Sequence, residues 1–172
     1  ETSHCVEVLK VTEVTVALLE ELTIEAIVIS PGPGKPSDYP ILKSVLDRYA
    51  SSVPILGICL GFQLIYEYYG GEIIHGPKPV HGHTTPIIHT GKGLFKHLPQ
   101  NFNVMRYHSL IANRQQLPSQ LNITATNNEG IMMAFEHDTL PIFAVQYHPE
   151  SILSKYGHQQ IQYFIEKVGK IH

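Results

Sequence analysis

The pattern with the clearest chemical meaning is a cysteine between two glycines, where a predicted strand meets a predicted helix. Gly57-Ile58-Cys59-Leu60-Gly61 follows the apolar run 54–58 and opens the amphipathic stretch 61–69 with almost no loop. This is the G-x-nucleophile-x-G pattern of a nucleophile elbow, which exposes its nucleophile at the carboxyl end of a sheet. The N-terminus of the next helix favours a thiolate, and the Leu60 N–H can help to hold an oxyanion. The pattern predicts a nucleophile at Cys59, with an unreactive buried cysteine as the alternative.

A cysteine nucleophile needs a nearby base, and His148 is the best candidate. It follows the predicted strand 141–147 and should lie at the carboxyl end of that strand, where ligand sites form in open α/β sheets. Glu150 stands two residues further on and can orient the imidazole. His108 is the main rival as base, but no carboxylate is near it in sequence. The predicted catalytic set is therefore Cys59, His148 and Glu150.

A rigid loop, Ser30-Pro31-Gly32-Pro33-Gly34, follows another short apolar run. Its prolines fix φ and its glycines expose backbone N–H groups, so it can bind an oxyanion or the main-chain groups of a substrate. A plain tight turn is the alternative. The loop is not a phosphate-binding P-loop, because no Gly-Lys-Ser/Thr follows at the required spacing. Gln63 lies one helical turn beyond Cys59 and can face the same pocket.

The elements that must position these residues alternate in the first part of the chain. Strands are predicted at 5–9, 26–30 and 54–58, and helices at 14–22, 38–50 and 61–69, with Ser37 or Asp38 capping the second helix. Short extended segments follow between residues 72 and 143, including a hairpin turn at 127–130, and a helix over 154–168 closes the chain. We therefore expect one α/β domain over residues 1–172, with an open, doubly wound, mostly parallel sheet flanked by helices and a small antiparallel insertion.

Composition excludes several classes of function. The 172 residues carry a formal net charge of −3, which gives no electrostatic basis for binding nucleic acid or an anionic membrane. No apolar run reaches the length of a membrane span, and Glu1–His4 shows no signal-peptide pattern. Two cysteines do not make a disulfide framework, so a cytoplasmic setting is expected. The histidines are scattered, and with His81-x-His83 as the nearest approach to a metal motif we expect neither a metal nor another cofactor.

Taken together, these segments resemble the class I glutamine amidotransferases, the triad type with a cysteine nucleophile. Four motifs match in order over nearly the whole chain, namely Ser30-Pro31-Gly32-Pro33-Gly34, Gly57-Ile58-Cys59-Leu60-Gly61-Phe62-Gln63, Arg106-Tyr107-His108-Ser109-Leu110 and Gln146-Tyr147-His148-Pro149-Glu150-Ser151. Within the family, the chain is most similar to component II of anthranilate synthase or aminodeoxychorismate synthase. The resemblance implies a flavodoxin-like fold, with Cys59 as nucleophile, His148 as base and Glu150 orienting it.

The resemblance also implies a substrate and a partner. The backbone of Gly32-Pro33-Gly34, with its glycine N–H groups, and the Leu60 N–H would surround the side-chain amide of L-glutamine, and Gln63, Ser109 and Leu110 would hold its amino-acid end. Hydrolysis through a glutamyl thioester would give glutamate and ammonia. A chorismate-binding synthase subunit would receive the ammonia and would contact the region of His81-Gly82. Which of the two synthases is the partner is left open, and we expect glutamine hydrolysis to depend largely on it.

Two departures from the family pattern accompany the resemblance. Phe62 stands where the family often has histidine, outside the triad, so little chemical consequence is expected. The first strand and helix of the family are absent from this sequence, and either omitted residues or a truncated relative would account for this. The alternative functions are therefore an inactive, synthase-binding relative, an α/β-hydrolase with a cysteine elbow and, less favoured, a thiol peptidase.

Overall fold

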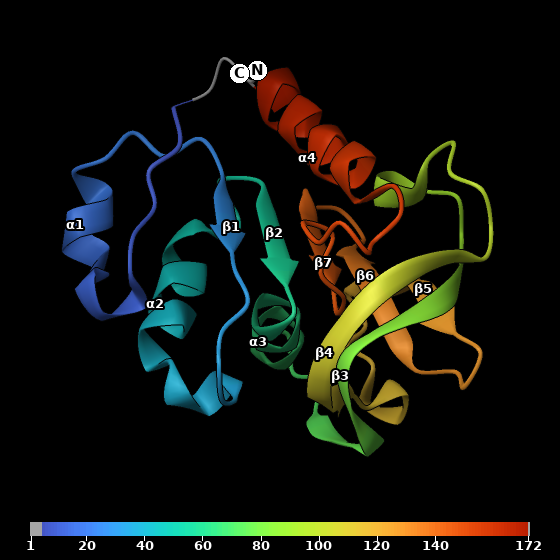
Figure 1. Cartoon of the computed structure of the whole chain (residues 1–172). Helices are drawn as coiled ribbons and strands as arrows, with labels where there is room; N and C mark the ends of the chain where they lie inside the picture. Colours follow the sequence, from blue (N-terminus) through green and yellow to red (C-terminus); the bar gives the residue numbers. More distant parts are fainter. Residues whose placement is uncertain (1–4, 172) are drawn as a thin grey trace.

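The computed structural model describes residues 5–171, and side chains as far as Val168, so the predictions on Glu1–His4 lie outside it. Its centre is a seven-stranded sheet in the order β1-β2-β7-β6-β5-β3-β4 (Figure 1). The strands are β1 (Ile27–Ile29), β2 (Ile55–Ile58), β3 (Ile73–His89), β4 (Phe102–Ala112), β5 (Leu121–Asn127), β6 (Met132–His137) and β7 (Ile142–Val145). The helices are α1 (Val16–Glu20), α2 (Pro40–Tyr49), α3 (Leu60–Tyr68) and α4 (Gly157–Ile171).

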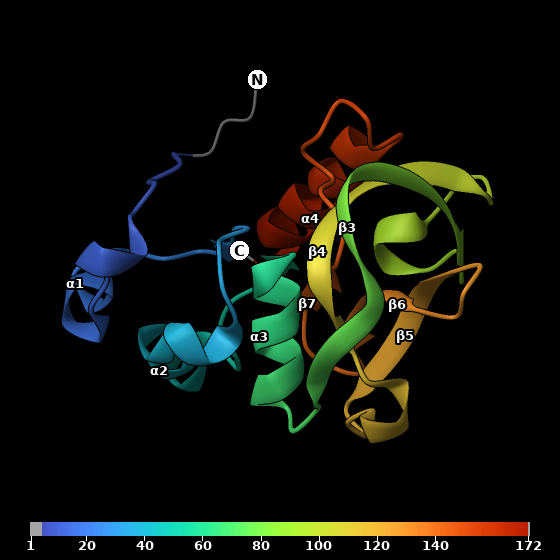
Figure 2. The ribbon, with the colours of Figure 1, turned by 60° about the horizontal axis from the view of Figure 1, so that its bottom comes forward.

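The sheet has a parallel part and an antiparallel part. β1, β2 and β7 pair in parallel, so their carboxyl ends share one edge of the sheet. β7 to β6, β6 to β5, β5 to β3 and β3 to β4 are antiparallel, and β3 and β4 form the long curved ribbon in Figures 1 and 2. The α/β class is confirmed, and the antiparallel part is larger than the small insertion expected.

Two buried clusters lie on opposite faces of the sheet, because successive strand residues point to opposite sides. In β2, Ile55 belongs to the cluster packed with α2 and α3, whereas its neighbour Leu56 belongs to the cluster that contains Phe164 and Val168 of α4. Figure 2 shows α3 and α4 on different sides of the strands. Helices therefore cover both faces, as the doubly wound prediction required.

Local predictions differ from the structure in two places. The predicted strand 5–9 is not in the sheet, and Val6 and Val8 are exposed, because no strand of the described chain pairs with this segment. The cap of α2 is Tyr39 rather than Ser37 or Asp38, because Pro40 occupies the first helical position. The Asp38 carboxylate accepts a hydrogen bond from the Lys35 N–H instead.

No helix within the described part of the chain has the length and apolar character needed to cross a bilayer.

Candidate active site

Cys59 occupies the sharp turn between β2 and α3. Its backbone has φ 55° and ψ −98°, a region that costs an L-residue roughly 1–3 kcal/mol. A Cβ at Gly57 would lie 2.6 Å from the Gly61 carbonyl oxygen, and one at Gly61 would collide with the carbonyl oxygen of Ile29. Both glycines are therefore required by close backbone approaches. The elbow predicted from the sequence is present in the structure.

The loop after β7 brings His148 and Glu150 together. His148 Nδ1 lies 2.7 Å from Glu150 Oε1, so the imidazole can donate a hydrogen bond to the carboxylate. The backbone N–H of His148 donates to the Met105 carbonyl on β4, and the Ser154 hydroxyl donates to the His148 carbonyl. These bonds fix the loop against β4. The loop follows β7 and therefore lies at the edge of the sheet where the neighbouring strand β2 also ends.

Cys59 and Glu150 both change the protonation of His148. The neighbouring sulfur and the carboxylate raise the pKa of His148 to about 9, against the opposing effect of burial. Burial raises the pKa of Glu150, but the hydrogen bond from His148, a backbone hydrogen bond and the charge of His148 together outweigh it, so the net pKa is lowered. At neutral pH the pair is therefore an imidazolium and a carboxylate, and His148 holds a proton that it can give away.

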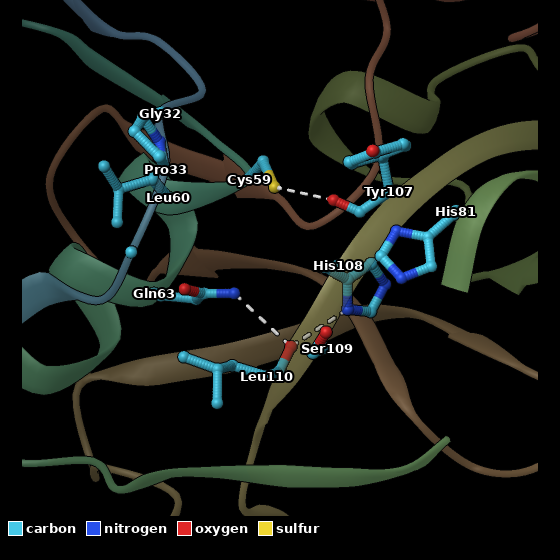
Figure 3. A pocket seen from close by; sticks show the side chains of 11 residues that line it. Gly32, Pro33, Cys59, Leu60, Gln63, His81, Tyr107, His108, Ser109 and Leu110 are labelled. Carbon is cyan, nitrogen blue, oxygen red and sulfur yellow. Dashed lines mark hydrogen bonds between the residues drawn. The ribbon is translucent and has the colours of Figure 1, made fainter. Parts of the chain in front are cut away.

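A cavity of about 200 Å³ opens beside the Cys59 sulfur (Figure 3). All the residues predicted to bind substrate line it, namely Gly32, Pro33, Gly34, Leu60, Gln63, Ser109 and Leu110. The structure thus gathers segments from β1, the elbow and β4 at one site. His148 and Glu150 are not among the lining residues, but His148 neighbours the sulfur of Cys59, which does line the cavity.

The loop 30–34 is held by a side chain outside the pocket. The Tyr39 hydroxyl donates to the Pro33 carbonyl over 2.6 Å, and Gly34 has φ +80°. In a planar trans peptide the C=O and N–H groups point in opposite directions, so the Gly34 N–H faces away from Tyr39. The loop therefore carries a fixed backbone donor, although its residues are solvent-exposed.

His108, the rival base, is tied into a different network. Arg106 Nε donates to His108 Nε2 over 3.2 Å, and His108 Nδ1 lies 2.9 Å from the Leu110 carbonyl. Because guanidinium can only donate, Nε2 must be unprotonated and Nδ1 must carry the hydrogen. Burial lowers the pKa of His108 to about 4. Both ring nitrogens are engaged, so His148 is better placed to exchange protons with Cys59.

Tyr107 and Gln146 were not assigned a role from the sequence, and His81 was expected only in the region that contacts the partner. His81 and Tyr107 line the cavity, and their rings pack edge to face with centroids 5.0 Å apart. Gln146 is fully buried, and its Nε2 lies 3.7 Å from Cys59 Sγ. Tyr107 and Gln146 belong to the motifs that carry the resemblance, which was the one available signal for them. Across residues 5–171, no group of three or more His, Cys, Asp and Glu side chains is placed to hold a metal ion.

Comparison with known proteins agrees with this geometry. Residues 1–168 match the family described as glutamine amidotransferase class-I. The chain is 40% identical over 157 residues to the aminodeoxychorismate/anthranilate synthase component 2 of Bacillus subtilis, covering 91% of this chain and 81% of that protein. It is 41% identical over 165 residues to a multifunctional tryptophan biosynthesis protein of Pichia angusta, covering 95% of this chain but 45% of that protein. The chain thus spans less than half of this longer relative.

Among solved structures, the chain is similar to a putative GMP synthase subunit from Thermoplasma acidophilum. The TM-score is 0.81 at 25% identity, with 91% of this chain and 78% of the other covered. The motifs, the elbow and the match over residues 1–168 agree, and the chain belongs to the class I glutamine amidotransferase family.

Proposed function

We propose that this chain hydrolyses L-glutamine to glutamate and supplies the ammonia to a synthase that aminates chorismate. The observation that carries the proposal is the position of Cys59. Its sulfur borders the cavity formed by the loop 30–34, Gln63 and the β4 segment 107–110, and it neighbours a histidine bound to Glu150. A reducing compartment keeps a free thiol nucleophile of this kind reduced, which supports a cytoplasmic location.

The chemistry follows from the protonation state of the pair. The Cys59 thiolate attacks the side-chain carboxamide carbon of glutamine, and backbone N–H groups of Leu60 and of the loop 32–34 hold the oxyanion. The His148 imidazolium gives its proton to the amide nitrogen. The carbon–nitrogen bond then breaks, which leaves a glutamyl thioester, neutral imidazole and ammonia.

Water completes the cycle. His148 takes a proton from the water while its oxygen attacks the thioester carbon, and the carbon–sulfur bond breaks. The new carboxyl group keeps the second hydrogen of the water and loses it as a proton when glutamate leaves, and the thiolate and imidazolium are restored. Each atom is accounted for by glutamine and water alone, so the proposed reaction requires no cofactor.

The surface beside the cavity supports a partner there. His81 and Gly82 lie on an exposed bulge of β3, where the register with β4 shifts, and His81 also lines the cavity. A partner protein bound at this bulge would lie next to the place where ammonia is formed. The names of the relatives from Bacillus subtilis and Pseudomonas aeruginosa describe component 2 of anthranilate or aminodeoxychorismate synthases, which supports that class of partner.

An assay of glutamate formation tests the proposal. The chain is incubated with glutamine alone and with a chorismate-aminating synthase, with Cys59→Ala as the control. We expect little hydrolysis by the chain alone, a large increase with the synthase, and none with Cys59→Ala. No glutamate under either condition would instead support the inactive, synthase-binding relative. The hydrolase alternative is disfavoured because the carboxylate that contacts His148 is Glu150, two residues away, and the family match points elsewhere.

A further inference from the structure

Gln146 directly precedes Tyr147 and His148 in the chain, and its side chain lies next to Cys59 of the elbow. It is completely buried, and its Nε2 is 3.7 Å from Cys59 Sγ. Its Oε1 is 3.4 Å from Gln63 Nε2, and Gln63 Nε2 is also 3.3 Å from the Leu110 carbonyl oxygen. Four groups therefore form one line of hydrogen bonds from the β4 wall of the cavity to the nucleophile.

The Leu110 carbonyl at one end of this line fixes which group donates in each of its hydrogen bonds. A backbone carbonyl can only accept, so the Leu110 oxygen must face the amino group of Gln63. The second hydrogen of that amino group then points to the Gln146 oxygen. The amide of Gln146 is thereby oriented with its own amino group toward Cys59. A flipped amide would place two oxygens, or two amino groups, against each other along the line.

The two protonation states of Cys59 use different partners. As a thiol, the sulfur can donate to the Tyr107 carbonyl, which lies 3.7 Å away. A thiolate cannot donate and is disfavoured beside a carbonyl oxygen, but it accepts from Gln146 Nε2. Gln146 is thus a neutral side-chain donor to this sulfur, beside the imidazolium of His148.

We propose that Gln146 is a further catalytic residue, whose N–H holds the Cys59 thiolate ready for attack. The inference rests on the proposed function only for its consequence in turnover, because the bond concerns the enzyme without substrate. It also gives Gln63 a second role, since Gln63 keeps the Gln146 amide oriented while lining the glutamine pocket. Through these hydrogen bonds, Gln146 would link Leu110 and Gln63 in the cavity wall to the protonation state of Cys59.

Alkylation of Cys59 by iodoacetamide tests the proposal without glutamine. The background is Cys5→Ser, which leaves Cys59 as the one thiol of the chain. The rate is measured across pH for this protein and for Gln146→Met, which keeps the shape but removes the donor. We expect the midpoint of the pH profile to rise by about one unit, and glutamine turnover with the synthase to fall about tenfold or more. Gln146→Glu, which replaces the donor by an acceptor, should raise the midpoint further.

The surroundings of the sulfur are otherwise unchanged in these variants. The titratable and charged groups around it are His148 and Glu150 after β7 and His81, Arg106, Tyr107 and His108 on β3 and β4. Gln160→Met is the matched control, because Gln160 is also a buried amide, and it accepts a hydrogen bond from the Tyr147 hydroxyl instead of donating to the sulfur. It should leave the midpoint unchanged.

An unchanged midpoint in Gln146→Met, with only a loss of stability, would overturn the proposal and make Gln146 a core residue. If Gln146→Met does not fold, Gln63→Met is measured instead, and a smaller upward shift is expected because the Gln146 amide loses its orienting donor. A shifted midpoint in a chain that never hydrolyses glutamine would refute the proposed function and leave this inference standing.

Discussion

His148 Nδ1 lies 2.7 Å from Glu150 Oε1, while Nε2 of the same ring is buried with no hydrogen-bond partner in the described structure. One side of the imidazole is thus fixed by a carboxylate, and the other is left for the sulfur and the substrate. His148 and Glu150 are therefore charged before any substrate binds, and the first two predictions follow from these charges.

Removal of the Glu150 carboxylate should lower the pKa of His148 and impair proton transfer. We expect Glu150→Gln to reduce the rate of glutamine hydrolysis by about 100-fold, with a smaller effect on KM. Steady-state kinetics with the synthase present measures it. Glu136→Gln, a half-buried carboxylate on β6, is the control and should retain activity. Equal losses in the two variants would show that any buried carboxylate matters.

Stability should depend on pH through His148. Its folded pKa, about 9, lies above the ordinary value of 6.5, so the folded state binds the proton more tightly. The resulting stabilisation is fully present below pH 6.5 and is lost as the pH rises through about 9. Urea unfolding of the wild type and His148→Gln at both ends of this window should show a difference that shrinks at the alkaline end. A difference that is constant with pH would contradict the assigned shift.

Because the backbone at Cys59 is strained, we expect glycine at this position to give a more stable protein than alanine, the reverse of the usual order. At φ 55° and ψ −98°, glycine is unstrained and alanine is not. Cys59→Gly should therefore be more stable than Cys59→Ala by about 1 kcal/mol, whereas glycine is normally the less stable of the two. Both variants should lack glutamine hydrolysis. Urea denaturation curves of the two variants show which has the larger free energy of unfolding.

The contact between α3 and β1 makes Gly61 sensitive to a single methyl group. In Gly61→Ala, the new Cβ would collide with the Ile29 carbonyl oxygen, and we expect a loss of about 3 kcal/mol in the free energy of unfolding. Gly70→Ala is the comparison, because its Cβ meets open space and only its φ of +98° opposes it. Its cost should be about 1–2 kcal/mol. Similar losses at both positions would argue against the steric requirement at the elbow.

The parts of the site that depend on neighbours in sequence could be predicted from it. Cys59 is placed by the two glycines around it, and Glu150 reaches His148 because only one residue separates them. The structure brings these segments together at one edge of the sheet, and their catalytic roles remain predictions. The role of Gln146 could not be foreseen, because the orientation of its amide depends on Leu110, which is far away in sequence.

In the fold, too, the features set by neighbouring residues could be predicted, and those set by distant residues could not. The strands 55–58 and 142–145 follow from continuous apolar runs, and the alternation of their two faces places helices on both sides. The extent of the antiparallel part was underestimated, because β3 carries glycines and prolines between His75 and His83, where its register with β4 shifts. Residues 5–9 alternate like a strand, but a strand also needs a partner, which local sequence does not specify.

The central claim, that Cys59 is the nucleophile for glutamine, is tested most directly by mass spectrometry after treatment with a diazo-ketone analogue of glutamine. We predict one adduct per chain, mapped to Cys59 rather than the exposed Cys5, and prevented by excess glutamine. No adduct on Cys59, even with the chorismate-aminating synthase present, or labelling that glutamine does not prevent, would contradict it.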